Sequence, residues 1–256
     1  MLNEFFISLL SVETIILLII GIVASMVGAL FGAAGLVTLP AMLLVGIPIH
    51  TSVAVNKFAT GLSAFTNVMT FFIKKQLSFK KTIGIMIIAI CGGILGAFLA
   101  TLLSERVMNT VACFLLIIAL ITVLLSKKYI SNAVIQEKEQ KINRAIPFII
   151  SIYDGGFGPG SASMSITYYL KKQFSYYKAI EFSRIVIFSS CFGAFWWYFF
   201  QGLVDWAIAI PIAVGSIVGS HIGIKLIPKI QMKWVQVALP LIFIILIAQV
   251  IYDLSF

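Results

Sequence analysis

The chain has 256 residues, of which 61% are hydrophobic and only 11% are charged, and its formal net charge is +9. A soluble domain of this length does not have such a composition, so a membrane protein with several spans is indicated. The basic residues cluster in short segments between apolar runs. The positive charge therefore indicates orientation in a membrane, and we exclude nucleic acid as a partner.

The first half of the chain is predicted to contain an apolar span that breaks at a small-residue segment. This span covers about 12–30 and ends at Phe31-Gly32-Ala33-Ala34-Gly35. A short apolar piece follows and is closed by Gly46-Ile47-Pro48. Apolar runs long enough to cross a bilayer as helices come next, over about 51–73, 82–103 and 108–125.

The second half repeats this order after a polar linker. A short apolar piece over about 145–153 meets Asp154-Gly-Gly-Phe-Gly-Pro-Gly160, and a second short piece leads to Lys171-Lys172. Further spans are predicted over about 176–200, 206–227 and 234–251. The sequence thus predicts an all-α polytopic membrane protein with about eight transmembrane helices plus broken or re-entrant segments. Its predicted parts are a first repeat over 1–125, a cytoplasmic linker over 126–145 and a second repeat over 146–256.

A shift of 127 residues aligns the two halves without a gap over a long stretch. Lys57 then falls on Arg184, and two glycines of the first half fall on glycines of the second: Gly92 on Gly219 and Gly96 on Gly223. Because the period is half the chain, this repeat is typical of a duplicated transporter rather than of a solenoid.

The basic residues predict how the spans are oriented. Fifteen of the 18 Lys and Arg residues lie in 74–81, 126–145, 171–178 and 225–233. By the positive-inside rule these segments are cytoplasmic, which makes the two halves inverted relative to each other. The alternative treats each broken pair as one kinked span and gives eight helices, parallel halves and cytoplasmic termini.

Two cations interrupt the apolar segments at matching points of the repeat, Lys57 and Arg184. Charge within hydrocarbon is costly and usually functional, so the pair predicts one shared site for an anion. Asn56 and Ser183 precede the cations and are candidate hydrogen-bond donors to it. Two other interpretations stay open: the cations snorkel to the interface, or Glu181 pairs with Arg184 and leaves Lys57 as the main ligand.

The two helix breaks are the second predicted part of the site. We expect the backbone around Gly32–Gly35 and Gly158–Gly160 to complete an anion cradle, because half-helix N-termini direct partial positive charge at an anion. The alternative is a kink or close helix packing. Asp154 lies beside the second break and is predicted either to carry a coupling proton or to cap the following half-helix.

No residue set suggests an enzyme or a cofactor. The cysteines (Cys91, Cys113 and Cys191) lie within apolar segments without a C-x-x-C spacing, and His50 and His221 are isolated. We therefore predict buried structural cysteines, no metal site, no cofactor and no enzymatic activity.

Four stretches of the chain resemble a known family. They are Tyr153-Asp-Gly-Gly-Phe-Gly-Pro-Gly160, Phe31-Gly-Ala-Ala-Gly-Leu-Val-Thr-Leu-Pro40, Asn56-Lys57 and Gly202-Leu-Val-Asp-Trp206. Together they resemble the TauE/SafE sulfite exporter family over nearly the whole chain. The resemblance implies a multi-pass carrier in the bacterial inner membrane that exports small sulfur oxyanions such as sulfite, sulfonates or sulfoacetate. Two departures touch the expected site: Ala33 and Ala34 stand where the family has more glycines, and Ser183-Arg184 where it more often has Thr-Lys.

The resulting hypothesis is an anion carrier that works by alternating access around a site between the two halves. Its expected partners are a small sulfur anion and the lipid bilayer, and homo-oligomerisation stays open. The alternative is a non-transporting membrane scaffold or accessory subunit, in which the two cations pair with acids on a partner.

Overall fold

The structure is a computed structural model that describes residues 12–31, 34–75, 77–112, 114–115, 117–118, 121 and 142–226. The predicted span over 234–251, most of the linker and Gly32 lie outside the described residues. All the regular secondary structure in the described part is helical, which confirms the predicted all-α class.

Eight helices have defined bounds within this part of the chain. They are α2 (Val12–Phe31), α3 (Ala34–Leu44), α4 (Ile49–Ile73), α5 (Phe79–Thr101), α7 (Ala145–Gly156), α8 (Ser161–Lys171), α9 (Tyr176–Phe200) and α10 (Trp206–Leu226). Residues 105–112 are also helical. Stretches of α2, α5, α9 and α10 are long and apolar enough to cross a membrane. α3, α7 and α8 have only 11, 12 and 11 residues, too few to span about 30 Å of hydrocarbon.

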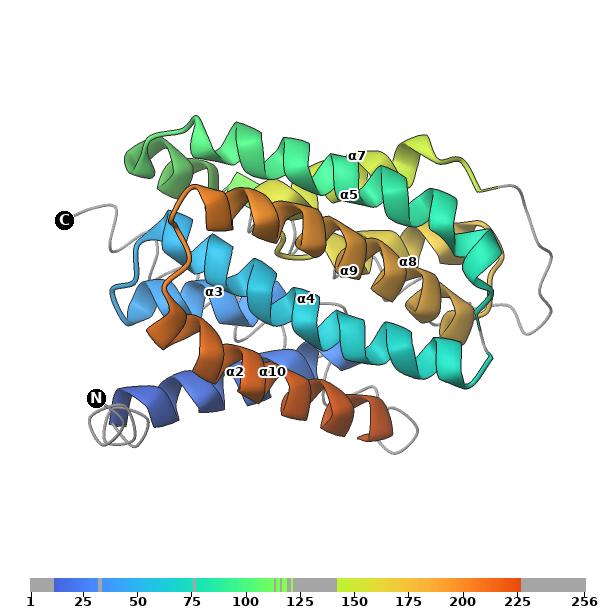
Figure 1. The fold of residues 1–256 in the computed structure, drawn as a ribbon, viewed down its shortest axis with the longest axis horizontal. Coiled ribbons are helices and arrows are strands. Elements are labelled where there is room, and N and C mark those ends of the chain that lie inside the picture. Colours follow the sequence, from blue (N-terminus) through green and yellow to red (C-terminus); the bar gives the residue numbers. More distant parts are fainter. Residues whose placement is uncertain are drawn as a thin grey trace.

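The long helices α4 and α9 lie side by side at the centre of the bundle and run in opposite directions (Figure 1). Three aromatic pairs fix this direction, with ring centroids 5.2, 5.4 and 6.3 Å apart: Phe58–Phe195, Phe65–Phe188 and Phe71–Tyr177. In this register Ser63 of α4 lies level with Ser190 of α9, two positions that the 127-residue shift also relates.

The outer helices pack across the predicted boundary between the halves. α5 contacts α7 and α9, whereas α10 contacts α2 and α4. Under the 127-residue shift α4 corresponds to α9 and α5 to α10, so each set of contacts is the counterpart of the other. The antiparallel direction of α4 and α9 is the one that inverted halves require.

Glycines set the close approach of these outer helices. A side chain at Gly96 of α5 would collide with the carbonyl oxygen of Ile152 in α7, and one at Gly223 of α10 would meet Ala29 and Met26 of α2. Because small residues let helix backbones approach, the glycines that match in the repeat pack against matching partners.

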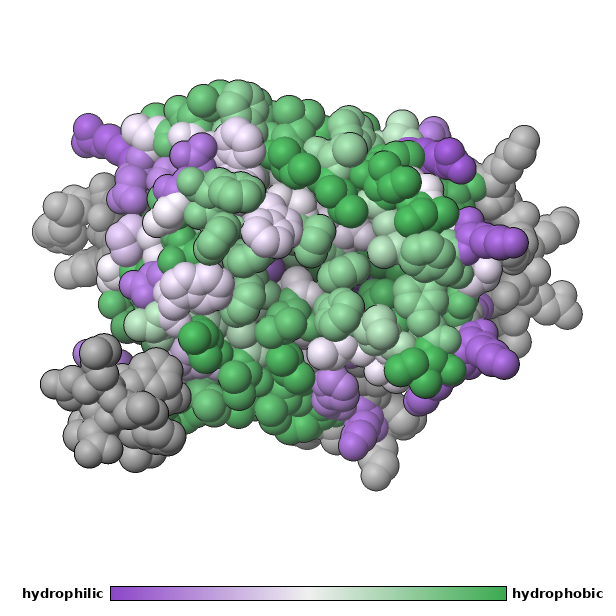
Figure 2. Space-filling view, in the orientation of Figure 1, coloured by the Kyte–Doolittle hydropathy of each residue, from purple (hydrophilic) through white to green (hydrophobic). Residues whose placement is uncertain are grey.

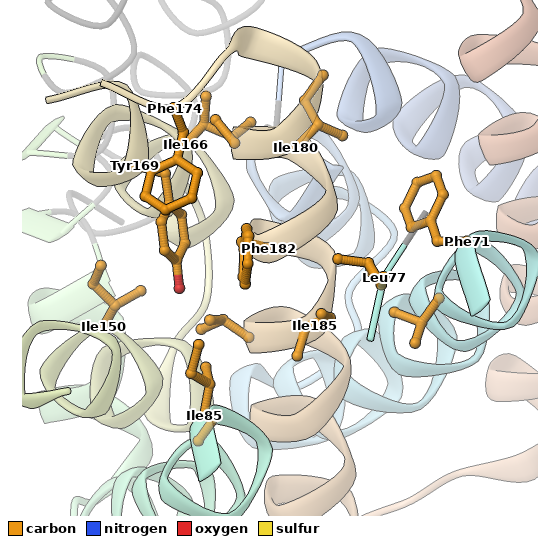
Figure 3. Packing of buried hydrophobic residues seen from close by; sticks show 14 residues of the cluster. Phe71, Leu77, Ile85, Ile150, Ile166, Tyr169, Phe174, Ile180, Phe182 and Ile185 are labelled. Atoms are coloured by element: carbon orange, nitrogen blue, oxygen red, sulfur yellow. The ribbon is translucent and has the colours of Figure 1, made fainter. Parts of the chain in front are cut away.

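The packing and the surface agree with a membrane-embedded bundle. Figure 2 shows an apolar region across the middle of the visible face, with hydrophilic residues mostly near its two ends. One buried cluster lies where α4 ends and α9 begins, and it includes Phe71, Leu77, Ile85, Tyr169 and Ile180 (Figure 3). It ties this end of the central helices to α5 and α8.

Candidate functional site

The break between α7 and α8 is built by two glycines with left-handed backbone and held by two tyrosines. Gly158 has φ +104° and Gly160 has φ +82°, a conformation that favours glycine. The Tyr153 hydroxyl donates to the carbonyl oxygen of Pro159 at 2.5 Å, and the Tyr198 hydroxyl donates to that of Gly155 at 3.1 Å. Carbonyls on both sides of the break are thus hydrogen-bonded inside the bundle, as an apolar environment requires.

Lys57 reaches this break from α4. Its side chain is 1% exposed, and Nζ lies 3.5 Å from Oδ1 of Asp154. Nζ also lies so close to Gly158 that a side chain there would collide with it. This burial excludes the snorkelling interpretation for Lys57. Nζ makes no hydrogen bond to any described residue.

Asp154, near the end of α7, is the acid that faces Lys57. Its Oδ1 accepts a hydrogen bond from the Ser161 hydroxyl at 2.5 Å. Its Oδ2 accepts from the Ser190 hydroxyl and lies 3.4 Å from Sγ of Cys191. Asp154 thus contacts the first residue of α8 through the Ser161 hydroxyl and contacts α9 through Ser190 and Cys191.

Arg184 of α9 contacts α2, in the first half of the chain. It is 6% exposed, which excludes snorkelling here as well, and its Nη2 donates to the carbonyl oxygen of Gly28 in α2 at 3.0 Å. The suggested pairing with Glu181 is not the one observed, since Glu181 binds Nζ of Lys178 at 2.9 Å. Lys178 lies closer to the helix end and neutralises the acid there.

Each cation therefore contacts the broken region of the opposite half. Lys57 lies against the α7–α8 break, while Arg184 binds Gly28, which packs against Ala34 at the start of α3. Lys57 lies six residues before Ser63 on α4, and Arg184 lies six residues before Ser190 on α9. Because α4 and α9 are antiparallel, this displaces the two Cα positions in opposite directions by about 9 Å each at 1.5 Å per residue. The structure does not bring the two cations into contact.

Asn56 and Ser183, the residues that precede the two cations, contact the starts of α3 and α8. A side chain at Gly35 would meet Nδ2 of Asn56 at 3.3 Å and Pro159 at 3.4 Å, so the two breaks touch beside Asn56. The Ser183 hydroxyl donates to the carbonyl oxygen of Ala162 at 3.1 Å. The 127-residue shift converts Asn56 and Gly35 into Ser183 and Ala162, so these two contacts are also counterparts.

A partly open and almost wholly apolar cavity of about 240 Å³ lies between α4 and α9. Its walls are largely aromatic, and Lys57 is the one charged residue among those that line it. The lining residues are Lys57, Phe58, Gly61, Leu62, Phe65, Phe188, Cys191, Phe192, Phe195 and Trp196. The cavity thus has room for a small anion, and the Lys57 side chain forms part of its wall, although Nζ itself is covered in this structure.

Sequence reasoning missed three residues of this site, Ser161, Ser190 and Cys191. Each contacts Asp154, but small residues of the same kind lie next to each of them in the sequence. One available signal was the run of small polar residues at 189–191 within an otherwise apolar helix, because polar groups in a span usually face the protein interior.

Buried charge at a broken helix, inside an apolar bundle of antiparallel helices, is the architecture of a membrane transporter. Comparison with known proteins agrees with this class. The family model described as "Sulfite exporter TauE/SafE" matches residues 17–250. The chain belongs to this family.

Three relatives illustrate the similarity. A probable membrane transporter protein, ORF9, of Sinorhizobium is 27% identical over 91% of this chain and 88% of its own length. A probable membrane transporter protein of Haemophilus influenzae is 25% identical over 93% and 94%, and YfcA of Escherichia coli, also a probable membrane transporter protein, is 24% identical over 93% and 89%. No solved structure matches. The chain is thus a multi-pass bacterial membrane protein of a transporter family and not an enzyme.

Proposed function

We propose that this protein carries small sulfur oxyanions, such as sulfite or organosulfonates, by alternating access around a site between its two halves. Family membership supports the class of substrate. Export is the direction that the family description implies. The residues proposed for the site are Lys57 and Arg184, supported by Asn56, Ser183 and the helix breaks.

The observation that carries the proposal is the state of Lys57. An ammonium group has three hydrogen-bond donors, yet Nζ is buried without a hydrogen bond to any described residue. Burying such a group unsatisfied is costly. An oxyanion in the adjoining cavity would supply several acceptor oxygens to Nζ, and charge-assisted hydrogen bonds of this kind are strong.

Each cation contacts the broken region of the opposite half, and this arrangement supports alternating access. Lys57 and Arg184 lie on opposite sides of the level at which Ser63 of α4 meets Ser190 of α9, and each contacts the broken region of the other half. A movement of one half against the other would change both contacts at once. In this proposal, the anion passes from the side of one cation to that of the other as the halves rock.

The test is flux through purified protein in liposomes, with sulfite, sulfate, thiosulfate and methanesulfonate as the probes. Lys57→Met and Arg184→Met should each lower anion flux at least tenfold, and the double variant should abolish it. Lys75→Met is the matched control, because it removes an exposed lysine and should leave flux unchanged. Undiminished flux in the double variant would overturn the site, and no wild-type flux with any probe would favour the scaffold.

A further inference from the structure

Asp154 makes Lys57 inaccessible to an anion as long as the carboxylate is charged. Oδ1 lies 3.5 Å from Nζ, and both side chains are almost fully buried, at 3% and 1% exposed. An oxyanion that reached Nζ from the cavity would stand within a few ångströms of a second negative charge. Like charges at that distance in a weakly polar interior do not both persist.

Lys57 nevertheless keeps hydrogen-bond donors that no described residue uses. Lys57 lines the cavity, and its Nζ has no hydrogen-bond partner among the described residues. At 3.5 Å the ion pair with Asp154 is longer than the 2.7–2.9 Å of a charge-assisted hydrogen bond. The ammonium group is thus positioned for a further ligand.

The surroundings of Asp154 suit the neutral acid as well as the carboxylate. The Ser190 hydroxyl donates to Oδ2 but also lies 3.2 Å from the carbonyl oxygen of Ile187, a second acceptor. If Asp154 gains a proton, Ser190 can donate to Ile187 and accept from the acid, since a hydroxyl group does both. Both protonation states of Asp154 are therefore hydrogen-bonded without a change of fold.

The ionisable groups that face Asp154 come from three helices. Lys57 comes from α4, Cys191 and Tyr198 from α9, and Tyr153 from α7 itself. The Ser161 hydroxyl contacts Asp154 from α8, and α5 brings the Gly93 backbone against neighbouring Gly155. Lys57 is the one cation among these groups. When an anion binds its ammonium group, the Asp154 carboxylate therefore loses the main charge that stabilises it.

We propose that Asp154 takes up one proton when an anion binds Lys57, so that proton and anion cross the membrane together. The proton enters on an Asp154 oxygen as the anion replaces the carboxylate as counter-ion of Nζ, and both leave on the opposite side. A monoanion then moves without net charge, and a dianion moves with one negative charge. This inference rests on the proposed anion transport and adds its coupling ion.

The test measures anion flux and internal pH together in the same liposomes. Methanesulfonate and thiosulfate are the first probes, because they stay fully ionised in the assay range and bring no proton of their own. Wild-type protein should move protons in the direction of the anion, at one per anion, and its flux should rise as the pH falls. Sulfite carries protons of its own in the assay range. For sulfite, the coupled protons are therefore given by the difference in proton movement between wild type and Asp154→Asn.

Asp154→Asn should lose proton movement to background and show anion flux that no longer depends on pH. Asp205→Asn is the matched control, since Asp205 lies in an exposed loop and the variant should keep wild-type coupling. Anion flux without protons in the wild type, which needs no variant to fold, would overturn the coupling alone. Wild-type coupling retained in Asp154→Asn would also overturn it, whereas no wild-type flux of any anion would defeat the carrier itself.

Discussion

Lys57 and Asp154 are buried together with the Ser161 and Ser190 hydroxyls around the acid. Breaking a buried ion pair by removing one partner leaves an uncompensated charge, which typically destabilises a protein by about 3–5 kcal/mol. Removing both charges avoids most of this cost. The two residues are therefore coupled in stability as well as in the proposed transport.

Lys57→Met should unfold at a lower temperature than wild type in detergent, because Asp154 is left buried without its cation. The double variant Lys57→Met with Asp154→Asn should regain most of that loss, with a coupling energy of roughly 1–3 kcal/mol. A thermal-unfolding double-mutant cycle measures it. Additive effects of the two substitutions would show that the ion pair does not stabilise the fold.

Gly158 combines a left-handed backbone with direct contact to Lys57. Gly158→Ala should lower stability by about 2–4 kcal/mol and abolish anion flux, because the new methyl group displaces Nζ in addition to the backbone cost of about 1–2 kcal/mol. Gly46→Ala is the matched control: Gly46 has φ +83° with no atom within 4 Å of an added Cβ. Equal losses in the two variants would mean that Lys57 does not occupy the space beside Gly158.

At the scale of elements, most helix bounds could be predicted from the sequence. The predicted span over 176–200 is α9, and that over 51–73 differs from α4 by two residues at one end. Apolar runs that end at Gly, Pro or Lys clusters explain this agreement, because both the break and the hydrophobic length are local signals. The partners of the charged residues could not be predicted in the same way. Lys57 and Asp154 are 97 residues apart, and only the packing of α4 against the α7–α8 break brings them together.

The glycine contact between α5 and α7 gives a prediction at this scale. Gly96→Ala should destabilise the protein by roughly 1–3 kcal/mol, because its methyl group would push α5 away from the Ile152 carbonyl. Gly84→Ala lies on the same helix but meets only the Arg144 side chain, at 3.3 Å, which can move. It should be neutral or slightly stabilising. Thermal unfolding of both variants in detergent checks this, and a neutral Gly96→Ala would contradict the packing.

For the whole molecule, inversion of the halves predicts which loops share a side of the membrane. The end of α4 lies beside the start of α9, as the Phe71–Tyr177 contact shows. Positions 75 and 173 should therefore lie on the cytoplasmic side, and positions 48 and 205 on the opposite side. A membrane-impermeant maleimide applied to intact cells should label Pro48→Cys and Asp205→Cys but not Lys75→Cys or Gln173→Cys.

The unmodified chain, with its own cysteines, supplies the background of this labelling experiment. Parallel halves would place positions 75 and 173 on opposite sides, so labelling of only one of those two would contradict inversion. Lysed cells should label all four variants and thus show that each cysteine can react.

The contacts of Lys57 and Arg184 with opposite halves also define the smallest assembly that could form the proposed site. Each half supplies a helix break and a cation, but its cation contacts the broken region of the other half. A protein made of one such half would therefore need a second copy lying upside down beside it. It would have to enter the membrane in both orientations in equal numbers, without the bias of basic residues that orients the present chain. Joining the halves in one chain makes that balance unnecessary and lets the two sides differ, as Lys57 with its acid and Arg184 with its carbonyl do here.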